Sequence, residues 1–277
     1  MNRECRSRTT AKPTTTMTKA MTATNGQGRQ AQGGGGQSGH GPPDRHAADC
    51  TGRAHVGGRE ERRGLAGDGR MRQAERVDKV DLKKLIASYR APRGRFEIVE
   101  VPPLQYLMID GHGDPNTSAE YTDALEALYP LAFRLKFFSK RELGRDFTVM
   151  PLEGLWWADD MSAFTAARDK SRWHWTMMIV QPDWIEQGHL DEVRAGVGAS
   201  AVDRVRLEAL DEGLCVQTLH VGPYNDEGPV LARLHDEFVP AEGLRLRGRH
   251  HEIYLGDPRR TAPERLRTIL RQPVQRG

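Results

Sequence analysis

Residues 248–257 read Gly-Arg-His-His-Glu-Ile-Tyr-Leu-Gly-Asp and alternate in polarity as a half-buried β-strand does. Successive side chains of a strand point to opposite faces, so Ile253 and Leu255 would pack on a core while Glu252 and Tyr254 face the other way. That second face offers a carboxylate beside a phenol, which together can accept a proton, donate a hydrogen bond or hold a cation. An exposed strand face is the alternative, because charged side chains mostly lie in solvent.

Five tryptophans lie between residues 156 and 184, and four of them fall on two expected strands, 147–157 and 173–181. Each ring alone could belong to a core. Four together are hard to bury in a small sheet, because a tryptophan is rarely buried completely and its indole N–H needs a partner. We therefore expect an aromatic-walled hollow that accepts flat, apolar or cationic ligands by stacking and cation–π attraction.

Glu252 and Tyr254 are the residues that we expect to be catalytic. Glu153 lies on an expected edge strand, so a solvated surface carboxylate is its alternative interpretation. His220 and Tyr224 flank a turn that follows a strand, and a structural role for His220 stays open. The expected substrate-binding residues are Trp157, Trp175, His220, Tyr224 and Glu153.

No histidine, cysteine or aspartate lies at a metal-ligand spacing from His220, and the adjacent pair His250-His251 is a weak metal signal. The sequence also contains no glycine-rich phosphate loop after a strand, no Gly-x-Ser-x-Gly elbow and no convincing Cys–His pair. The sequence therefore predicts a site without a metal or another cofactor.

Composition divides the chain of 277 residues into two unlike parts. Residues 1–76 contain no Phe, Tyr or Trp and hold 14 of the 29 glycines. Such a segment cannot bury enough apolar surface to offset its conformational entropy, so we interpret 1–76 as a disordered tail and 77–277 as the folded domain. Because domain-like sequence begins almost directly after Met71, the tail is alternatively an incorrectly assigned extension of the reading frame. The intact mass of the protein from its native host would decide between the two.

Charge follows the same division. Residues 1–76 carry 14 Lys and Arg against 7 Asp and Glu, whereas residues 77–277 carry 27 against 31. The mildly acidic folded part argues against specific nucleic-acid binding and suits neutral or cationic small ligands. The three cysteines show no metal or disulfide spacing, and no run of about 18 apolar residues is present to span a membrane. We expect a cytoplasmic protein without a membrane partner, and its oligomeric state stays open.

The elements that would position these residues form an α+β fold. The order strand–helix–strand–strand occurs twice, in residues 104–181 and 214–274. Such a doubled module can close around a pseudo-two-fold cleft, which is where small molecules bind. In the first module we expect a helix that starts at a capping box, 117–120, and is kinked or ended at Pro130. A largely helical segment, 184–210, would connect the two modules.

Two long motifs carry a resemblance to a known family. They are Gln-Thr-Leu-His-Val-Gly-Pro-Tyr at 217–224 and His-His-Glu-Ile-Tyr-Leu-Gly-Asp-Pro-Arg-Arg at 250–260, with the ending Thr-Ile-Leu-Arg-Gln-Pro-Val at 268–274. Together with Pro-Leu-Glu-Gly-Leu-Trp-Trp at 151–157, they resemble the GyrI-like small-molecule-binding family, and most closely its stand-alone bacterial branch. The resemblance covers residues 79–274.

The resemblance implies two strand–helix–strand–strand modules and an acidic cleft residue at Glu252, which in the family's drug-sensing regulators meets cationic aromatic ligands. For the stand-alone branch it implies hydrolysis of cyclopropanoid DNA-alkylating compounds, and this sequence shows no helix-turn-helix segment that would favour a regulator. We therefore predict a hydrolase that protects the cell, with Glu252 activating water. The alternative is a protein that sequesters drugs without turnover. An inhibitor of a protein partner would need a more acidic surface than the folded part offers.

Overall fold

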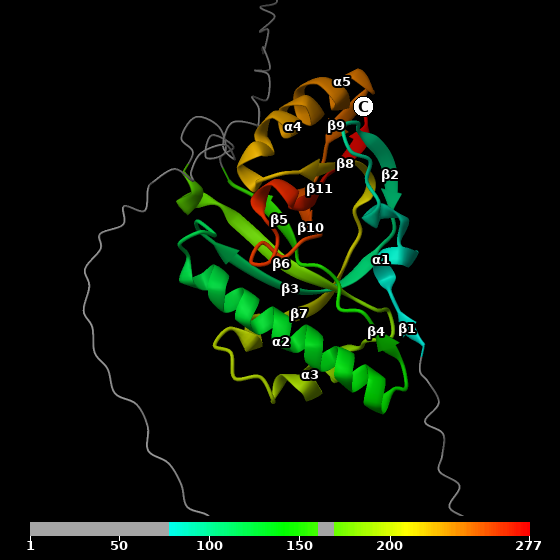
Figure 1. Cartoon of the computed structure of the whole chain (residues 1–277), viewed down its shortest axis with the longest axis vertical. Coiled ribbons are helices and arrows are strands. Elements are labelled where there is room, and N and C mark those ends of the chain that lie inside the picture. Colours follow the sequence, from blue (N-terminus) through cyan, green and yellow to red (C-terminus); the bar gives the residue numbers. More distant parts are fainter. Residues whose placement is uncertain (1–77, 160–168) are drawn as a thin grey trace, which may run out of the picture. The chain divides into compact units, whose positions relative to one another are not determined.

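The computed structural model describes residues 78–159 and 169–277 (Figure 1). The expected tail, 1–76, lies outside the described residues, so its disorder stays a prediction. Within the described ranges, no helix is both long enough and apolar enough to cross a membrane.

An antiparallel sheet of nine strands organises the described residues. Its order is β2-β8-β11-β10-β5-β6-β3-β7, and β9 pairs with β11 beside this path. The strand β2 at Glu97–Val101 lies at one end and β7 at Arg206–Leu210 lies at the other. The remaining strands are β3 Leu104–His112, β5 Glu153–Trp157, β6 His174–Gln181, β8 Gly213–Val221, β9 Leu244–Leu246, β10 His250–Tyr254 and β11 Arg267–Arg276.

Two strand–helix–strand–strand modules build most of this sheet, which confirms the predicted α+β fold. The first consists of β3, the helix α2 at Ala119–Glu142, β5 and β6. The second consists of β8, a helical segment, β10 and β11, and its helical segment contains α4 at Gly228–Ala232, a π-helical stretch at Arg233–Phe238 and α5 at Val239–Ala241. The modules join where β10 pairs with β5, so the middle of the sheet is the seam between them.

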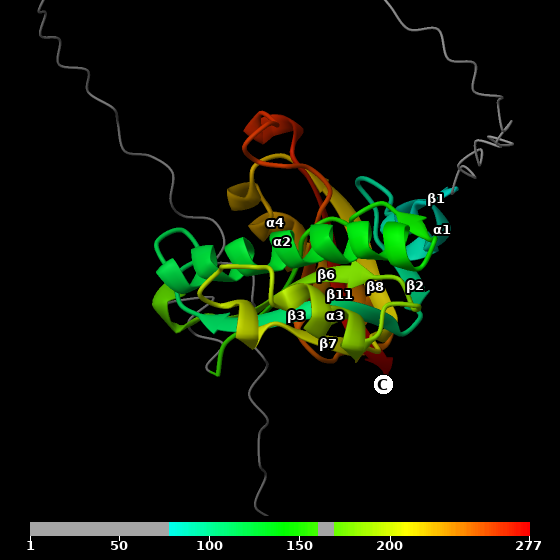
Figure 2. The same cartoon turned by 90° about the horizontal axis from the view of Figure 1, so that it is seen from below.

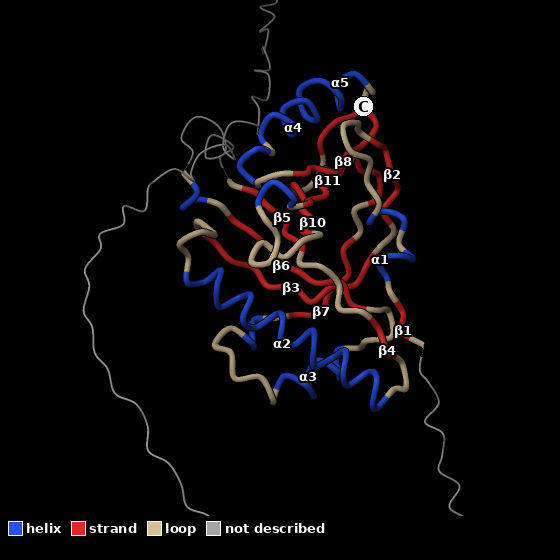
Figure 3. Tube along the Cα trace, viewed as in Figure 1, coloured by secondary structure: helices blue, strands red, loops and turns tan. Residues whose placement is uncertain are grey.

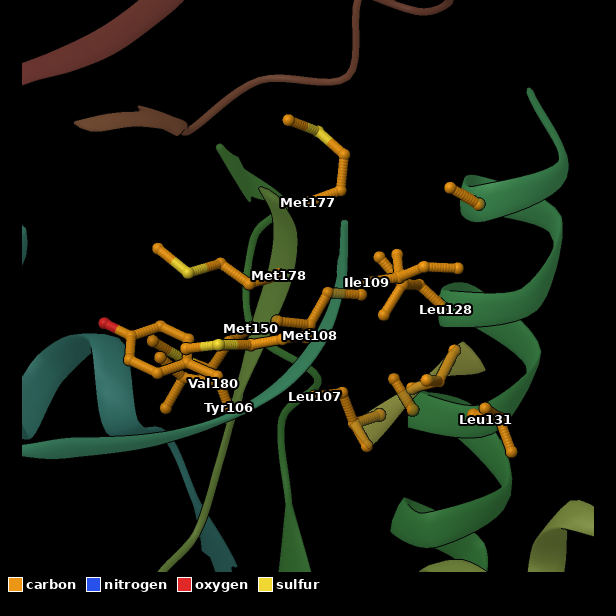
Figure 4. Packing of buried hydrophobic residues seen from close by; sticks show 14 of the residues in the cluster. Tyr106, Leu107, Met108, Ile109, Leu128, Leu131, Met150, Met177, Met178 and Val180 are labelled. Atoms are coloured by element: carbon orange, nitrogen blue, oxygen red, sulfur yellow. The ribbon is translucent and has the colours of Figure 1, made fainter. Parts of the chain in front are cut away.

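Both modules place their helices over one face of the sheet, which we call the Glu252 face (Figure 2). On β3, Leu107 and Ile109 point toward α2 (Figure 4). In the second module, the His235 ring of the helical segment lies against the His250 ring of β10. The strand registers place the following side chains on this face: Ile109, Met177, Trp175, Trp156, His250, Glu252, Tyr254, Thr268 and His220.

We call the opposite side of the sheet the His251 face. A 3₁₀ turn at Ala87–Tyr89 lies against it, preceded by β1 at Lys79–Val80 and α1 at Leu82–Leu85. In Figure 4, several buried side chains gather on the side of the strands away from α2: Tyr106, Met108, Met150, Met178 and Val180. The strand registers add to this face Glu153, Leu155, Trp157, His251, Ile253 and Arg271.

The helix α2 continues through Pro130 to Glu142, so of the two predicted outcomes, a kink or an end at this proline, the end was wrong. A proline inside a helix removes a hydrogen bond and costs about 3 kcal/mol or more, which packing must offset. The helix begins at Ser118, whose hydroxyl accepts a 3.3 Å hydrogen bond from the Tyr121 N–H, one residue later than the predicted capping box. The side chains buried on both sides of the proline are Ala124, Ala127, Leu128, Leu131, Ala132 and Leu135.

Two other expected elements differ in the structure. The segment 184–210 forms only a short helix, α3 at Gln187–Arg194, before its end becomes β7 (Figure 3). Pairing with β7 satisfies the backbone groups of β3 that would otherwise form a free sheet edge. The expected single strand 147–157 is split into β4 at Asp146–Phe147 and β5, because Pro151 between them has no N–H for a strand ladder.

Candidate functional site

Glu252 on β10 is only 5 % exposed, whereas a carboxylate ordinarily lies in solvent. Its Oε2 atom accepts a hydrogen bond of 2.8 Å from the Tyr254 hydroxyl, so these two side chains share a face as the alternation predicted. Its Oε1 atom lies 3.5 Å from Nε2 of His250. Within the described residues, Glu252 forms no ion pair with a lysine or an arginine.

Trp156 on the neighbouring strand β5 extends this arrangement. Its Nε1 atom donates a hydrogen bond of 3.0 Å to the Tyr254 hydroxyl, which in turn donates to Glu252. Directly opposite Glu252 stands Gly154, where a Cβ atom would come within 2.9 Å of Trp156 Nε1 and 3.2 Å of the Tyr254 hydroxyl. The glycine therefore leaves the room that the indole and the phenol need.

Tyrosines from both modules converge on this place. Tyr224, in a 3₁₀ turn after β8, stands edge-on to Tyr254 with ring centroids 5.6 Å apart. From the other module, Tyr121 of α2 stands edge-on to Trp175 at 5.3 Å. Tyr121, Tyr224 and Tyr254 are each half-buried, so the ring cluster extends from Glu252 to the protein surface.

Electrostatics keep these phenols protonated. Burial and then the charge of Glu252 raise the pKa of the Tyr254 hydroxyl and of the Tyr121 hydroxyl. Burial also raises the pKa of Tyr224, followed by the carboxyls of Glu227 and Glu252. A neutral phenol beside a carboxylate can donate a hydrogen bond to it or to a ligand, so the described surroundings of Glu252 supply hydrogen-bond donors and no lysine or arginine.

A pair of histidines lies behind Glu252. The rings of His235 and His250 meet edge-to-face at 6.3 Å, and both are buried. Burial and then His250 lower the pKa of His235 to about 3, so its imidazole is neutral at pH 7. None of the four ring nitrogens has a hydrogen-bond partner among the described residues. Buried nitrogens of this kind are normally satisfied by water or a ligand.

Of the expected site residues, the structure brings Tyr254 and Tyr224 to Glu252. Trp175 lies on the same face but is fully buried, with its ring so close to Gly111 that a Cβ atom there would lie 1.9 Å away. Trp175 contacts the Tyr121 ring, and Tyr121 in turn lies near Glu252. The catalytic and binding roles of these residues stay predictions.

The structure separates Glu153 and Trp157 from Glu252, which corrects the expectation that all of them line one site. The register of β5 against β10 places both on the His251 face. Glu153 is fully buried there, so it is not a solvated edge carboxylate either, and it accepts hydrogen bonds from Tyr89 and His251. The Trp157 ring stacks on His174 and lies 3.6 Å below the Arg249 guanidinium.

His220 has a structural contact. Its Nε2 atom lies 3.1 Å from the Pro223 carbonyl oxygen, across the turn that carries Tyr224. Between them Gly222 has a φ of 146°, a conformation that favours glycine. His220 also borders a cavity of about 170 Å³ whose lining residues do not include Glu252. It therefore shapes the turn that presents Tyr224.

Four residues near Glu252 were missed by the sequence analysis. The sequence shows Trp156 and Tyr121 as aromatic residues on an expected strand and an expected helix. The face to which each side chain points depends on strand register and helix phase, which the sequence does not give. His250 was considered only as a metal ligand. Glu227 is 1 % exposed at the start of α4, and its only signal was an acidic residue beside an apolar helix face. Among the described residues, no group of three or more histidine, cysteine or acidic side chains could hold a metal ion.

Comparison with known proteins agrees with this fold. A search of the curated proteins gave no match. A solved structure of an uncharacterized conserved protein from Listeria innocua is 37 % identical, with a TM-score of 0.65, and covers 71 % of this chain and 100 % of its own. A structure of a hydrolase from Listeria innocua is also 37 % identical, with a TM-score of 0.62 and the same coverage. The family model described as the GyrI-like small molecule binding domain matches residues 95–275, and the chain therefore belongs to this family.

Proposed function

We propose that this small-molecule-binding domain is a hydrolase that opens the cyclopropane ring of cyclopropanoid genotoxic compounds and so protects the cell. The observation that carries the proposal is the burial of Glu252, 5 % exposed beside aromatic rings, with no lysine or arginine partner among the described residues. The structure from Listeria innocua that is described as a hydrolase, 37 % identical to this chain, supports the reaction class.

Glu252 is arranged as a general base. One carboxylate oxygen, Oε2, is fixed by the Tyr254 hydroxyl at 2.8 Å. The other, Oε1, lies 3.5 Å from Nε2 of His250 and can accept a proton from water. Holding the carboxylate by one oxygen orients the second oxygen toward the reacting water, which reduces the entropy cost of the reaction.

The substrate supplies the rest of the driving force. Its strained cyclopropane is conjugated to a dienone-like ring, so attack of water on a ring carbon sends an electron pair to the carbonyl oxygen. The product ring becomes aromatic and the leaving group stays in the same molecule. The reaction therefore needs a base, an orienting surface and no cofactor.

The tyrosines and tryptophans would orient the ligand. Tyr224, Tyr254 and Tyr121 are half-buried and offer ring faces and edges to a flat molecule. We propose that the partner is a flat aromatic or cationic small molecule, taken up in the cytoplasm, and that neither a specific nucleic acid nor a membrane is involved. An aromatic pocket between the two modules is the part of this proposal that a ligand-bound structure would test.

A protein that sequesters drugs without turnover would use the same residues, with Glu252 as the countercharge of a bound cation. The buried carboxylate, which no lysine or arginine of the described ranges pairs with, also favours this second function, because a cationic ligand would neutralise it. The two functions differ in their product: a hydrolase releases a ring-opened compound and a sequestering protein returns the ligand unchanged.

The test is incubation of the full chain with a cyclopropanoid dienone, followed by mass spectrometry of the small molecule. We expect the mass of one added water and catalytic turnover. Glu252→Gln should lower the rate by about 10²–10⁴-fold, because the amide cannot take a proton. Glu264→Gln, which changes an exposed carboxylate, is the matched control and should keep the wild-type rate. Stoichiometric binding without product would overturn the hydrolase proposal in favour of sequestration.

A further inference from the structure

A second carboxyl group, that of Glu227, is buried near Thr268, which pairs with Tyr254 across β10 and β11. Glu227 follows the turn that carries Tyr224 and immediately precedes α4, but its side chain does not cap that helix. It is 1 % exposed, and its Oε1 atom has no hydrogen-bond partner among the described residues. A glutamate is almost never fully buried without a partner, so this carboxyl needs an explanation.

The groups that face Glu227 come from three elements. Glu252 and Tyr254 face it from β10, Tyr224 from the preceding turn and Thr268 from β11. The Thr268 hydroxyl likewise has no hydrogen-bond partner among the described residues. In the part of the chain that the structure describes, neither Glu227 nor Glu252 forms an ion pair with a lysine or an arginine.

Two buried carboxyl groups without a cation cannot both be ionised, because like charges repel strongly where water is excluded. Burial, and then the charge of Glu252, raise the pKa of Glu227 well above its usual range, and the Thr268 hydroxyl offsets only part of this rise. Hydrogen bonds decide which group keeps the charge. Glu252 accepts the 2.8 Å hydrogen bond of the Tyr254 hydroxyl, which stabilises a carboxylate, whereas Glu227 Oε1 accepts none from the described residues.

We infer that Glu227 is the general acid of the site: it holds a proton as a neutral carboxylic acid and donates it to the ligand oxygen on which negative charge develops, while Glu252 takes the proton of the attacking water. This inference rests on the proposed function, since it assigns the second half of the same reaction. It commits the ligand to a compound whose strained ring is conjugated to a carbonyl group.

Atoms and electrons balance in this step. The water oxygen bonds to the strained ring carbon, the carbon–carbon bond breaks, and its electron pair moves through the conjugated system to the carbonyl oxygen. Glu252 receives a proton from the water and Glu227 gives one to the new phenolate oxygen, so the product is an alcohol and a phenol. The site then has a protonated Glu252 and an ionised Glu227, and one proton transfer between them restores it without an oxidant, reductant or cofactor.

The protonation state can be tested without turnover. In the full chain labelled with ¹³C at the glutamate side-chain carboxyl, we expect one resonance of a neutral carboxylic acid at pH 7 that disappears in Glu227→Gln. In Glu252→Gln the same resonance should titrate at lower pH, because the neighbouring negative charge is gone. An ionised Glu227 at pH 7, or a titration that Glu252→Gln leaves unchanged, would overturn the inference.

Its role in the reaction is tested by the pH profile of ring opening. Glu227→Gln keeps a hydrogen-bond donor but cannot release a proton, so we expect a loss of about 10²–10⁴-fold in kcat, without the fall in rate that the wild type shows at alkaline pH. Asp226→Asn changes an exposed neighbour and should retain the wild-type profile. If the wild type opens the ring and Glu227→Gln does so at the same rate and with the same profile, the acid role is wrong while the hydrolase stands. If the wild type shows no turnover, both proposals fail.

Discussion

The two faces of β10 bury ionisable groups in opposite ways. On the His251 face, His251 is fully buried and contacts a carboxylate with each ring nitrogen: Nδ1 lies 2.9 Å from Glu212 and Nε2 lies 3.0 Å from Glu153. Arg271 approaches Glu212 to 2.8 Å. On the other face, Glu252 accepts a hydrogen bond from a neutral phenol, that of Tyr254.

Charge explains the difference. Burial alone would lower the pKa of His251, but Glu212 and Glu153 raise it, so a protonated His251 and Arg271 balance two carboxylates. The Glu252 face holds two carboxyls, Glu227 and Glu252, and the described residues offer them no lysine or arginine. On the His251 face, every buried charge has an oppositely charged partner, so these residues form a structural network. On the Glu252 face, the described residues leave the two carboxyl groups without such partners, and these groups can bind a ligand.

Removing a charged partner on the His251 face should lower the free energy of unfolding the most. Glu212→Gln leaves Arg271 and His251 with an uncompensated buried charge, which ordinarily costs about 3–5 kcal/mol. Glu252→Gln removes a buried charge that has no cationic partner among the described residues, so its free energy of unfolding should stay within about 1 kcal/mol of the wild type. Urea unfolding at pH 7 measures both. Equal losses for the two variants would contradict the division between the faces.

The His251 face should also determine how far the pH can fall before the protein loses stability. Burial alone would raise the pKa of Glu212, but His251 and Arg271 lower it from 4.5 to about 2. A lowered carboxyl pKa contributes stability that is present above pH 4.5 and is lost as the pH falls toward 2. At 1.4 kcal/mol for each pKa unit, this contribution is roughly 3 kcal/mol.

Thermal unfolding across this pH range measures the effect, and Glu212→Gln should show a flatter decline than the wild type. His251 acts with the opposite sign. Its pKa is raised, so its contribution is present below about pH 6.5 and is lost as the pH rises through the folded-state pKa. A melting temperature in Glu212→Gln that falls with acid as steeply as in the wild type would contradict the assignment.

On the Glu252 face, Glu227 should make the free energy of unfolding fall as the pH rises. Glu227 is neutral in the folded protein and ionised in the unfolded chain above its usual pKa of 4.5, so the wild type loses about 1.4 kcal/mol for each pH unit up to the raised folded-state pKa. Glu227→Gln has no proton to lose. Relative to the wild type, its free energy of unfolding should therefore rise between pH 5 and pH 7, by up to about 1.4 kcal/mol for each pH unit.

Urea unfolding at these two pH values measures the change, with Asp226→Asn as the exposed control. A stability difference between Glu227→Gln and the wild type that is the same at both pH values would show that Glu227 is already ionised in the folded protein.

The sequence predicted what depends on local pattern. Alternation within one strand placed Glu252 and Tyr254 on the same face, and two repeats of strand–helix–strand–strand predicted the modules. It did not predict which side of β5 meets that face, because this depends on the pairing of β5 with β10, and a shift of one residue exchanges the faces of Trp156 and Trp157. Glu153 was therefore assigned to the wrong side.

Glu227 could not be predicted for a different reason. An acidic residue at the start of a helix normally stabilises the helix N-terminus from solvent, which explains its type without any site. Only the packing of the second module's helical segment on β10 and β11 turns this side chain inward. Its relation to Glu252, 25 positions away in the sequence, therefore exists only in the folded chain.

The smallest predicted effect compares two tyrosines that donate to buried glutamates from opposite sides of the sheet. Tyr89 donates to Glu153 on the His251 face, and Tyr254 donates to Glu252 on the other. Replacing either tyrosine with phenylalanine removes one hydrogen bond to a charged group, so each variant should lose about 1.5–3 kcal/mol of unfolding free energy.

Only one of the two variants, Tyr254→Phe, should change the rate of ring opening. Tyr254→Phe frees the Oε2 atom of Glu252 and leaves the Trp156 N–H without its acceptor, so ring opening should slow about tenfold, as a barrier higher by 1.4 kcal/mol implies. Tyr89→Phe leaves Glu252 and its neighbours in place, so its turnover should equal that of the wild type at a temperature where both are folded. The two variants remove the same hydroxyl group. A similar loss of activity in both would mean that the rate follows stability, and it would contradict the placement of the active site on the Glu252 face.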